Sequence, residues 1–268
     1  MTNTLRLLQD IGEAEQLNYS LDKYADYGVL EIYSDQLDAE QLKNKLIQDY
    51  SLTDIIVKEV FDGKKSILFG DCPSKLTVVE NDYKFIVELK SDDVGLPLSK
   101  AEVRNLLKEY SSGKDVLDLF AYTGHLSVYC RNAKSLSTVE SEAKYVQKLK
   151  KNFEMNSIEL PQIWDVNFRD FIDLAIESRT KWDLIVMDLS SYNLERIKDF
   201  NLNTDHMDLI KEVQRKLLKE AGFLMLLTDQ NDFVLNQYIR PGADKLTNKL
   251  IPEGFKPVKP NHIYVFYN

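Results

Sequence analysis

The 268-residue sequence has only two cysteines and three histidines, and it has no long apolar run. Cys72 and Cys130 lie far apart and lack the spacing of metal ligands, so we expect free thiols and no metal site. A transmembrane helix needs about 18 or more consecutive apolar residues, which the sequence does not provide. Residues 1–16 are acidic and periodic, unlike a secretory signal. We therefore expect a cytoplasmic protein with no membrane partner.

Glycine is also scarce, at ten residues, and this restricts the nucleotides that the chain could bind. The G-x-G-x-x-G loop, which lets a backbone approach a pyrophosphate closely, is absent. The G-x-S-x-G turn is absent too, which argues against Ser-His-Asp catalysis. A ligand that carries a ribose but no phosphates remains compatible with the single Gly124 of residues 116–124.

Excess positive charge is missing from the first third of the chain. Residues 1–94 hold 10 Lys and Arg against 19 Asp and Glu, whereas residues 95–268 hold 24 of each kind. The whole net charge of −9 therefore belongs to the first third. Because phosphate repels carboxylate, that third is a poor nucleic-acid platform, while the neutral remainder can still carry local basic patches.

Two different rhythms of apolar residues divide the sequence. Residues 1–94 alternate short strand patterns with one helix pattern at 38–50, which predicts a small acidic α+β domain, and residues 91–99 are a linker candidate. Residues 95–268 alternate apolar strands with helices. Strands buried on both faces are typical of a doubly wound parallel sheet. We expect an α/β fold with a Rossmann-like sheet in residues 95–268.

Acidic residues recur where the predicted parallel strands end, which is where such sheets bind ligands. They are Asp118, Glu140, Asp170 and Asp188. Each one alone could cap a helix or lie on the surface, but their joint placement predicts a site. Glu140 ends the second strand, where nucleotide-binding sheets put an acid on the ribose hydroxyls. S-adenosylmethionine has a ribose, no phosphates and cationic groups that suit an acidic pocket.

Three stretches, VLDLFAYTG (116–124), 137–156 and WDLIVMD (182–188), resemble class I S-adenosylmethionine-dependent methyltransferases acting on large-subunit ribosomal RNA. The resemblance runs from about residue 76 to the end. It implies that one group of residues holds the methionine end of the cofactor, namely Asp118, Phe120, Tyr122, Thr123 and Gly124. It also implies that Glu140 binds the ribose, Ser141 borders the adenine, and Asp170 and Phe171 lie beside the adenine amino group. Asp188 would face both cofactor and acceptor.

The sequence departs from this family mainly on the substrate side. The Asp-Pro-Pro of the family reads Asp188-Leu189-Ser190-Ser191-Tyr192 here, so both prolines are lost. The motif that precedes the catalytic domain survives only as VGLPLSKAEVR at 94–104. Residues 190–193 are too polar for a typical core segment, so we expect Tyr192 to be accessible and to stack on an acceptor base. We expect His125 to be a packing or capping residue.

Three functions remain open from the sequence. The first is methylation of RNA, with ribosomal RNA as the partner and Asp188 and Tyr192 orienting the acceptor. The second is methylation of a small molecule or protein, and the third is a non-catalytic interaction module. By resemblance, the cytosine-modifying branch carries a Cys just after the fifth strand, where residues 227–231 have no sulfur. This predicts a nitrogen or oxygen acceptor. The oligomeric state is left open.

Overall fold

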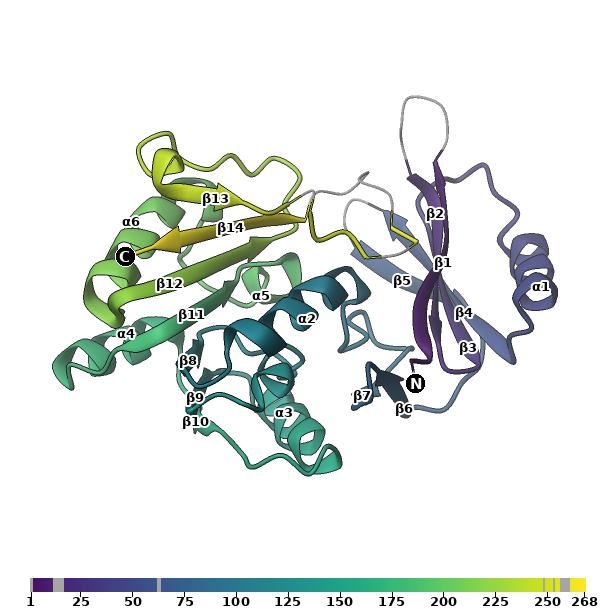
Figure 1. Ribbon diagram of the computed structural model, residues 1–268. Coiled ribbons are helices and arrows are strands. Elements are labelled where there is room, and N and C mark those ends of the chain that lie inside the picture. The colour runs from purple at the N-terminus through teal and green to yellow at the C-terminus, as the bar shows by residue number, and fades with distance from the viewer. Residues whose placement is uncertain (1, 12–16, 62–63, 248, 253, 256–260) are drawn as a thin grey trace. The chain divides into compact units, whose positions relative to one another are not determined.

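The computed structural model describes residues 2–11, 17–61, 64–247, 249–252, 254–255 and 261–268. The chain divides into two compact units, Met1–Ala101 with Ile251–Val258, and Glu102–Leu250 with Lys259–Asn268. Figure 1 draws both units. The sequence-based boundary after residue 94 stays a prediction. No helix in the described part of the chain is long and apolar enough to cross a bilayer.

The first unit is a small α+β assembly. Its sheet has the order β1-β2-β3-β4-β5, with bounds Thr4–Ile11, Leu17–Tyr24, Tyr27–Ile32, Asp54–Phe61 and Lys64–Phe69. Strands β3 and β4 are parallel and the other pairs are antiparallel. A hairpin follows, made of β6 (Leu76–Glu80) and β7 (Tyr83–Val87), and then a 3-10 turn, η2 (Leu98–Lys100). The α+β class is confirmed, although β1 and β2 were not predicted as strands.

Helix α1 (Ala39–Tyr50) connects the parallel pair of the first unit. The Asp38 side chain caps it by accepting a hydrogen bond from the Gln41 N–H at 2.9 Å, which satisfies an amide that the helix itself leaves unpaired. Leu46 is buried, and Leu42 and Ile47 pack against the same core. The helical spacing of these three residues therefore explains which face the helix turns inward.

The second unit contains a seven-stranded sheet within the described residues. Its order is β10-β9-β8-β11-β12-β14-β13. In chain order the strands are β8 (Asp115–Asp118), β9 (Ser135–Val139), β10 (Gln162–Trp164), β11 (Trp182–Asp188), β12 (Leu218–Thr228), β13 (Ala243–Lys245) and β14 (His262–Tyr267). Strands β8 to β12 pair in parallel, and β13 and β14 are antiparallel. The predicted doubly wound, parallel-rich sheet is confirmed.

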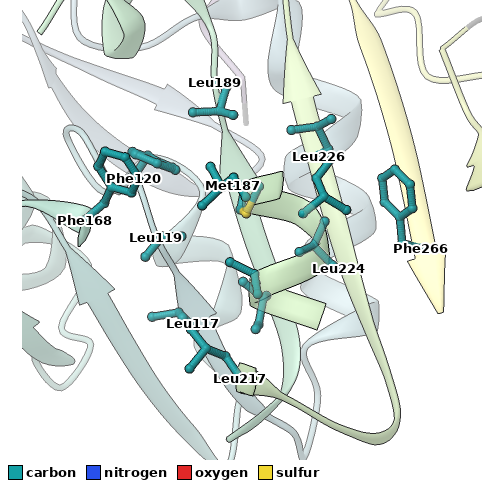
Figure 2. Close-up of a cluster of buried hydrophobic side chains, with 14 of the residues drawn as sticks. Leu117, Leu119, Phe120, Phe168, Met187, Leu189, Leu217, Leu224, Leu226 and Phe266 are labelled. Atoms are coloured by element: carbon teal, nitrogen blue, oxygen red, sulfur yellow. The ribbon is translucent and has the colours of Figure 1, made fainter. Parts of the chain in front are cut away.

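Alternate residues of these strands enter two different cores. Leu117 belongs to a cluster that contains side chains of α4 (Phe168–Glu177) and α6 (Leu202–Leu217). Its neighbour Val116 belongs to a second cluster with side chains of α2 (Ala101–Tyr110). Figure 2 shows the first cluster, where Met187 of β11 and Leu224 of β12 lie near Leu117. Burial on both faces follows from the two-residue period of a strand and explains why the strands are so apolar.

The remaining helices differ from the prediction at two crossovers. Helices α3 (Ala143–Met155) and α5 (Ser191–Leu194) follow β9 and β11. After β8 the chain forms only the 3-10 turn η3 (Ser127–Cys130), and after β12 only η4 (Arg240–Gly242). Residues 121–130 are buried throughout, leaving no solvent face for an amphipathic helix. In the second crossover Pro241 lacks an amide hydrogen and disfavours a continuous helix.

The strand order reverses between β8 and β11. From β8 the chain proceeds to β9 and β10 on one side, and it returns to β11 and β12 on the other. Asp118 pairs with Val186 in the ladder, and the Leu119 N–H donates to the Val186 carbonyl at 2.9 Å. The carboxyl ends of β8 and β11 therefore lie side by side at the switch point, where sheets of this kind bind ligands.

Candidate functional site

A cavity of about 420 Å³ opens beside the carboxyl ends of β8, β9 and β10. This volume is typical of small-molecule sites. Its lining comprises Leu119, Phe120, Val139, Glu140, Ser141, Val166, Asn167, Phe168, Arg169, Asn193, Arg196, Ile197, Lys198 and Asp199. Among the residues predicted for the site, Phe120, Glu140 and Ser141 line this cavity. The described residues contain no cluster of His, Cys, Asp and Glu side chains that could hold a metal ion.

Glu140 is the acid of this cavity, and its carboxylate is surrounded by donors. It is buried, with 5% of its surface exposed. Oε2 accepts the Tyr122 N–H and Oε1 accepts the Glu142 N–H, both at 2.9 Å. Arg196 donates to Oε1 at 2.7 Å and to Oε2 at 3.3 Å. Burial raises the pKa of Glu140, and the Arg196 charge and the hydrogen bonds offset part of that rise.

The turn after β8 is fixed by two residues with positive φ. Tyr122 has φ 52° and Gly124 has φ 73°. The Tyr122 N–H is held by Glu140, and the Thr123 carbonyl accepts a hydrogen bond from Asn152 at 2.9 Å. A Cβ on Gly124 would lie 2.8 Å from Leu149 Cγ of α3. Glycine at this position therefore provides both the backbone conformation and the space for α3 to pack.

Gly124→Ala is expected to destabilise the protein by about 3 kcal/mol, from the left-handed backbone and the contact with Leu149. Gly113→Ala is the matched control, because Gly113 has φ 70° but no heavy atom within 4 Å of an added Cβ. It should cost only the backbone part, about 1 kcal/mol. Equilibrium urea unfolding of both variants measures the difference. Equal losses would contradict the packing role.

Asp118 ends β8 as a completely buried carboxylate. Its Oδ2 accepts the Ser127 hydroxyl at 2.5 Å, while Oδ1 has no hydrogen-bond partner among the described residues. Burial raises the pKa of Asp118 to about 7, and the charges of Asp188 and Glu140 add to the rise. A buried oxygen without a donor is costly, and a cationic amino group is the kind of ligand that would satisfy it.

Asp188 is enclosed by the polar residues that follow it. Its Oδ1 accepts both the N–H, at 3.2 Å, and the hydroxyl of Ser190, and its Oδ2 accepts the Tyr192 hydroxyl. Asn193 donates to the Asp188 carbonyl at 2.7 Å. A proline at position 190 could not donate its nitrogen, so the change from the family pattern brings a hydrogen bond with it.

The expectation that residues 190–193 lie outside the core is wrong for Ser190 and Asn193, while Ser191 and Tyr192 are half-buried. Ser190 and Asn193 are buried, and Ser191 donates its N–H and hydroxyl to Asp229, both at 2.7 Å. The segment tolerates burial because these polar groups find partners. The Tyr192 ring lies against Tyr122, with centroids 4.6 Å apart, instead of standing free. Burial and the Asp188 charge raise the Tyr192 pKa, so its hydroxyl stays a donor.

His125 is buried and connects Tyr192 to a residue that the sequence did not single out. Arg104 Nη1 lies 3.3 Å from His125 Nδ1, and Tyr192 Oη lies 3.4 Å from His125 Nε2. A guanidinium can only donate, so Nδ1 accepts and Nε2 carries the hydrogen in the neutral ring. The hydrogen bonds therefore run from Arg104 through His125 and Tyr192 to Asp188. This chain of hydrogen bonds orders the side chains of Tyr192 and Asp188.

Asp170 and Phe171 do not line the cavity, so their place beside the adenine stays a prediction. Phe171 is a core residue between Trp164 and Trp182, with ring centroids 5.4 and 5.8 Å away. Asp170 is exposed on the first turn of α4 and accepts a hydrogen bond from Asn167. Only the start of α4, Asn167 to Arg169, reaches the cavity. Asp170 and Phe171 follow it, and the helix directs them elsewhere.

Asn167 and Phe168, at the start of α4, line the cavity. Asn167 caps α4 by accepting the N–H groups of Arg169 and Asp170 at 2.9 and 3.0 Å. Phe168 packs against Phe120, with ring centroids 5.2 Å apart, and Figure 2 draws the two rings beside each other. The sequence contained a signal for this helix start, because an Asn directly before a helical pattern marks where the helix begins.

Comparison with known proteins gives consistent similarities. The chain is 26% identical over 277 residues to the ribosomal RNA large subunit methyltransferase K/L of Alteromonas mediterranea, covering 95% of this chain and 39% of that protein. It is 32% identical over 199 residues to the ribosomal RNA large subunit methyltransferase K of Neisseria meningitidis, covering 71% and 56%. The chain therefore spans about two fifths to just over half of these relatives.

A solved structure is described as a candidate methyltransferase in complex with SAH. Its match covers 100% of this chain and 76% of the chain in that structure, with a TM-score of 0.81 and 19% sequence identity. That likeness agrees with the sheet order and confirms the methyltransferase fold. The model of a protein family, described as conserved hypothetical protein 95, matches residues 99–239, which is more than half of the sequence. The chain thus belongs to the conserved hypothetical protein 95 family and has the Rossmann-like fold of S-adenosylmethionine-dependent methyltransferases.

Proposed function

We propose that this chain is an S-adenosylmethionine-dependent methyltransferase that acts on RNA, with ribosomal RNA as the substrate class. The observation that carries the proposal is the cavity beside the ends of β8, β9 and β10, which is lined by the buried acid Glu140. Asp118, at the end of β8, does not line this cavity, but it adds a second buried acid at the same edge of the sheet. The names of the curated relatives and the SAH complex of the structural neighbour support it. A cytoplasmic location, where ribosomal RNA is processed in bacteria, is part of the proposal.

The residues of the cavity fit this cofactor. Glu140 offers a carboxylate to the ribose hydroxyls, and the adenine side is formed by Phe120, Ser141, Asn167 and Phe168. Asp118 would accept the amino group of the methionine end, beside the Tyr122–Gly124 turn. When bound, the cofactor supplies an electrophilic methyl group. Leu119, Phe120, Val139 and Phe168 give this cavity an apolar and aromatic part on which an adenine ring could pack.

The acceptor side is built for orientation. Asp188 is held by Ser190 and Tyr192 and can accept a hydrogen from an exocyclic amino group or a ring N–H of a base. Tyr192 keeps its proton and acts as a donor. Methyl transfer to a nitrogen requires chiefly that the acceptor lone pair be positioned in a dry pocket. This arrangement suits a nitrogen acceptor, and the ribosomal RNA methyltransferases among the relatives favour RNA over a small molecule or a protein.

Calorimetric titration with S-adenosylhomocysteine tests the proposal. We expect saturable binding by the wild-type chain, and unchanged affinity in Asp170→Ala because Asp170 lies outside the cavity. Transfer of labelled methyl groups to ribosomal RNA, and not to a protein extract, would then identify the substrate class. No detectable heat at high micromolar ligand would contradict cofactor binding and favour a non-catalytic interaction module.

The choice of nitrogen or oxygen over pyrimidine carbon 5 has its own test. Carbon 5 chemistry requires a thiolate nucleophile, but residues 227–231 have no sulfur. Cys130 is buried, it contacts the Leu126 carbonyl at 3.7 Å, and burial raises its pKa to about 12. RNA containing 5-fluorocytosine should therefore form no covalent complex with the wild type. A trapped complex that disappears in Cys130→Ala would refute this acceptor assignment.

A further inference from the structure

Arg196 binds the carboxylate of Glu140, the same group that the proposed function assigns to the ribose of the cofactor. Its guanidinium contacts both carboxylate oxygens, at 2.7 and 3.3 Å, and 16% of the Arg196 side chain is exposed against 3% for Glu140. Both residues line the same cavity. This is a nearly buried, two-pronged ion pair, which is the strong geometry for Arg and a carboxylate.

The position of Arg196 is fixed by contacts beyond the ion pair. Its guanidinium lies over the Tyr145 ring at 4.4 Å and the Tyr122 ring at 5.6 Å from the centroids. Its Nε donates to the Tyr192 carbonyl at 2.8 Å, and its Nη2 donates to Asn193. The side chain is therefore ordered by aromatic faces and by the backbone of the α5 region.

The acceptor capacity of Glu140 is already used. A carboxylate provides about four lone-pair positions. Oε1 accepts Glu142 N–H and Arg196 Nη1, and Oε2 accepts Tyr122 N–H and Arg196 Nη2. The two backbone donors belong to the turn after β8 and the start of α3, so they cannot withdraw without unfolding those segments. Arg196 is the partner that can leave.

We propose that Arg196 competes with the cofactor for Glu140, so that a ribose diol binds only when the Arg196 guanidinium is displaced. The inference rests on the proposed function, because the ribose belongs to the cofactor. It makes Arg196 a determinant of cofactor affinity that acts against binding. Removing it should leave Glu140 with two backbone donors and two open acceptor positions that match the two hydroxyls of a ribose.

Titration with S-adenosylhomocysteine at pH 8 tests the competition. Arg196→Met should bind about 10-fold more tightly than the wild type, the gain expected when a charge-assisted pair no longer has to be broken. The matched control is Arg215→Met, which removes the same charge from an exposed position of α6 outside the cavity and should change the affinity by less than about 2-fold. Arg196→Lys, which keeps the charge but loses the two-pronged geometry, should fall between them.

Two further variants show whether the gain acts through Glu140. In a Glu140→Gln background, Arg196→Met should give little gain, because a neutral amide lacks the charge that strengthens its hydrogen bonds to the guanidinium. Weaker binding by Arg196→Met would make Arg196 a direct cofactor ligand, and unchanged binding would remove it from the ribose position; either result overturns the inference. If the wild type and Arg215→Met also fail to bind, the proposed function itself is refuted. Should Arg196→Met not fold, as judged by its thermal transition, Arg196→Lys decides the question.

Discussion

Replacing Glu140 by Ala is expected to lower the free energy of unfolding by about 3–5 kcal/mol and to remove measurable binding of S-adenosylhomocysteine. Losing one partner of a buried ion pair leaves the other charge uncompensated, which costs about this much. The change also leaves the Tyr122 N–H, in a buried turn, without its acceptor. Equilibrium urea unfolding and calorimetry on the same preparation measure both effects.

Glu142→Ala is the matched control for this prediction. It removes the same charge two residues along the chain, and the Glu142 side chain neither caps α3 nor lines the cavity. Its stability should stay within about 0.5 kcal/mol of the wild type, as for most surface substitutions. If the two variants lose the same amount of stability, Glu140 is not the organising residue of the site.

Asp118→Asn is expected to flatten the dependence of stability on pH between about pH 4 and pH 7. The folded pKa of Asp118 is raised from 3.8 to about 7, so the folded state holds this proton more tightly than the unfolded chain does. The corresponding stability is fully present below pH 4 and is lost as the pH rises through 7, by roughly 4 kcal/mol. Asparagine cannot ionise and should not show this loss.

Urea unfolding at several pH values measures the slope, and Asp115→Asn is the control at the other end of β8. Hydrogen bonds, first of all from Lys219, lower the Asp115 pKa to about 2. Asp115 therefore affects stability in the opposite direction to Asp118 and at lower pH. Its stabilising contribution is present above about pH 4 and is lost as the pH falls towards 2. In Asp118→Asn, a smaller dependence of stability on pH remains, because the pKa of Glu140 is raised in the folded protein as well. An undiminished slope in Asp118→Asn would show that Asp118 is ionised in the folded protein at neutral pH.

The sequence by itself determined the fold class and the edge of the sheet where the site lies. In strands such as 182–188, apolar side chains occupy both faces of the strand. Such a strand is buried only in a sheet that is covered on both sides. Parallel strands bring their carboxyl ends to one edge, so Asp118, Glu140 and Asp188 were certain to gather there once the sheet was predicted. These conclusions rest on periodicity, which is a local property of the chain.

The tertiary structure decided which side chains meet at that edge. Arg196 and Glu140 are separated by 56 residues, and no local pattern pairs them. Phe168 instead of Phe171 faces the cavity because the Asn167 cap sets where α4 begins. Ser190 and Asn193 became buried, and Ser191 half-buried, because Asp188 and Asp229 accept their hydrogen bonds. Strand and helix periodicity determine which side of an element is buried. Which distant residue a side chain then contacts depends on the order of the strands and on the path of the connections between them, and both are set only when the sheet assembles.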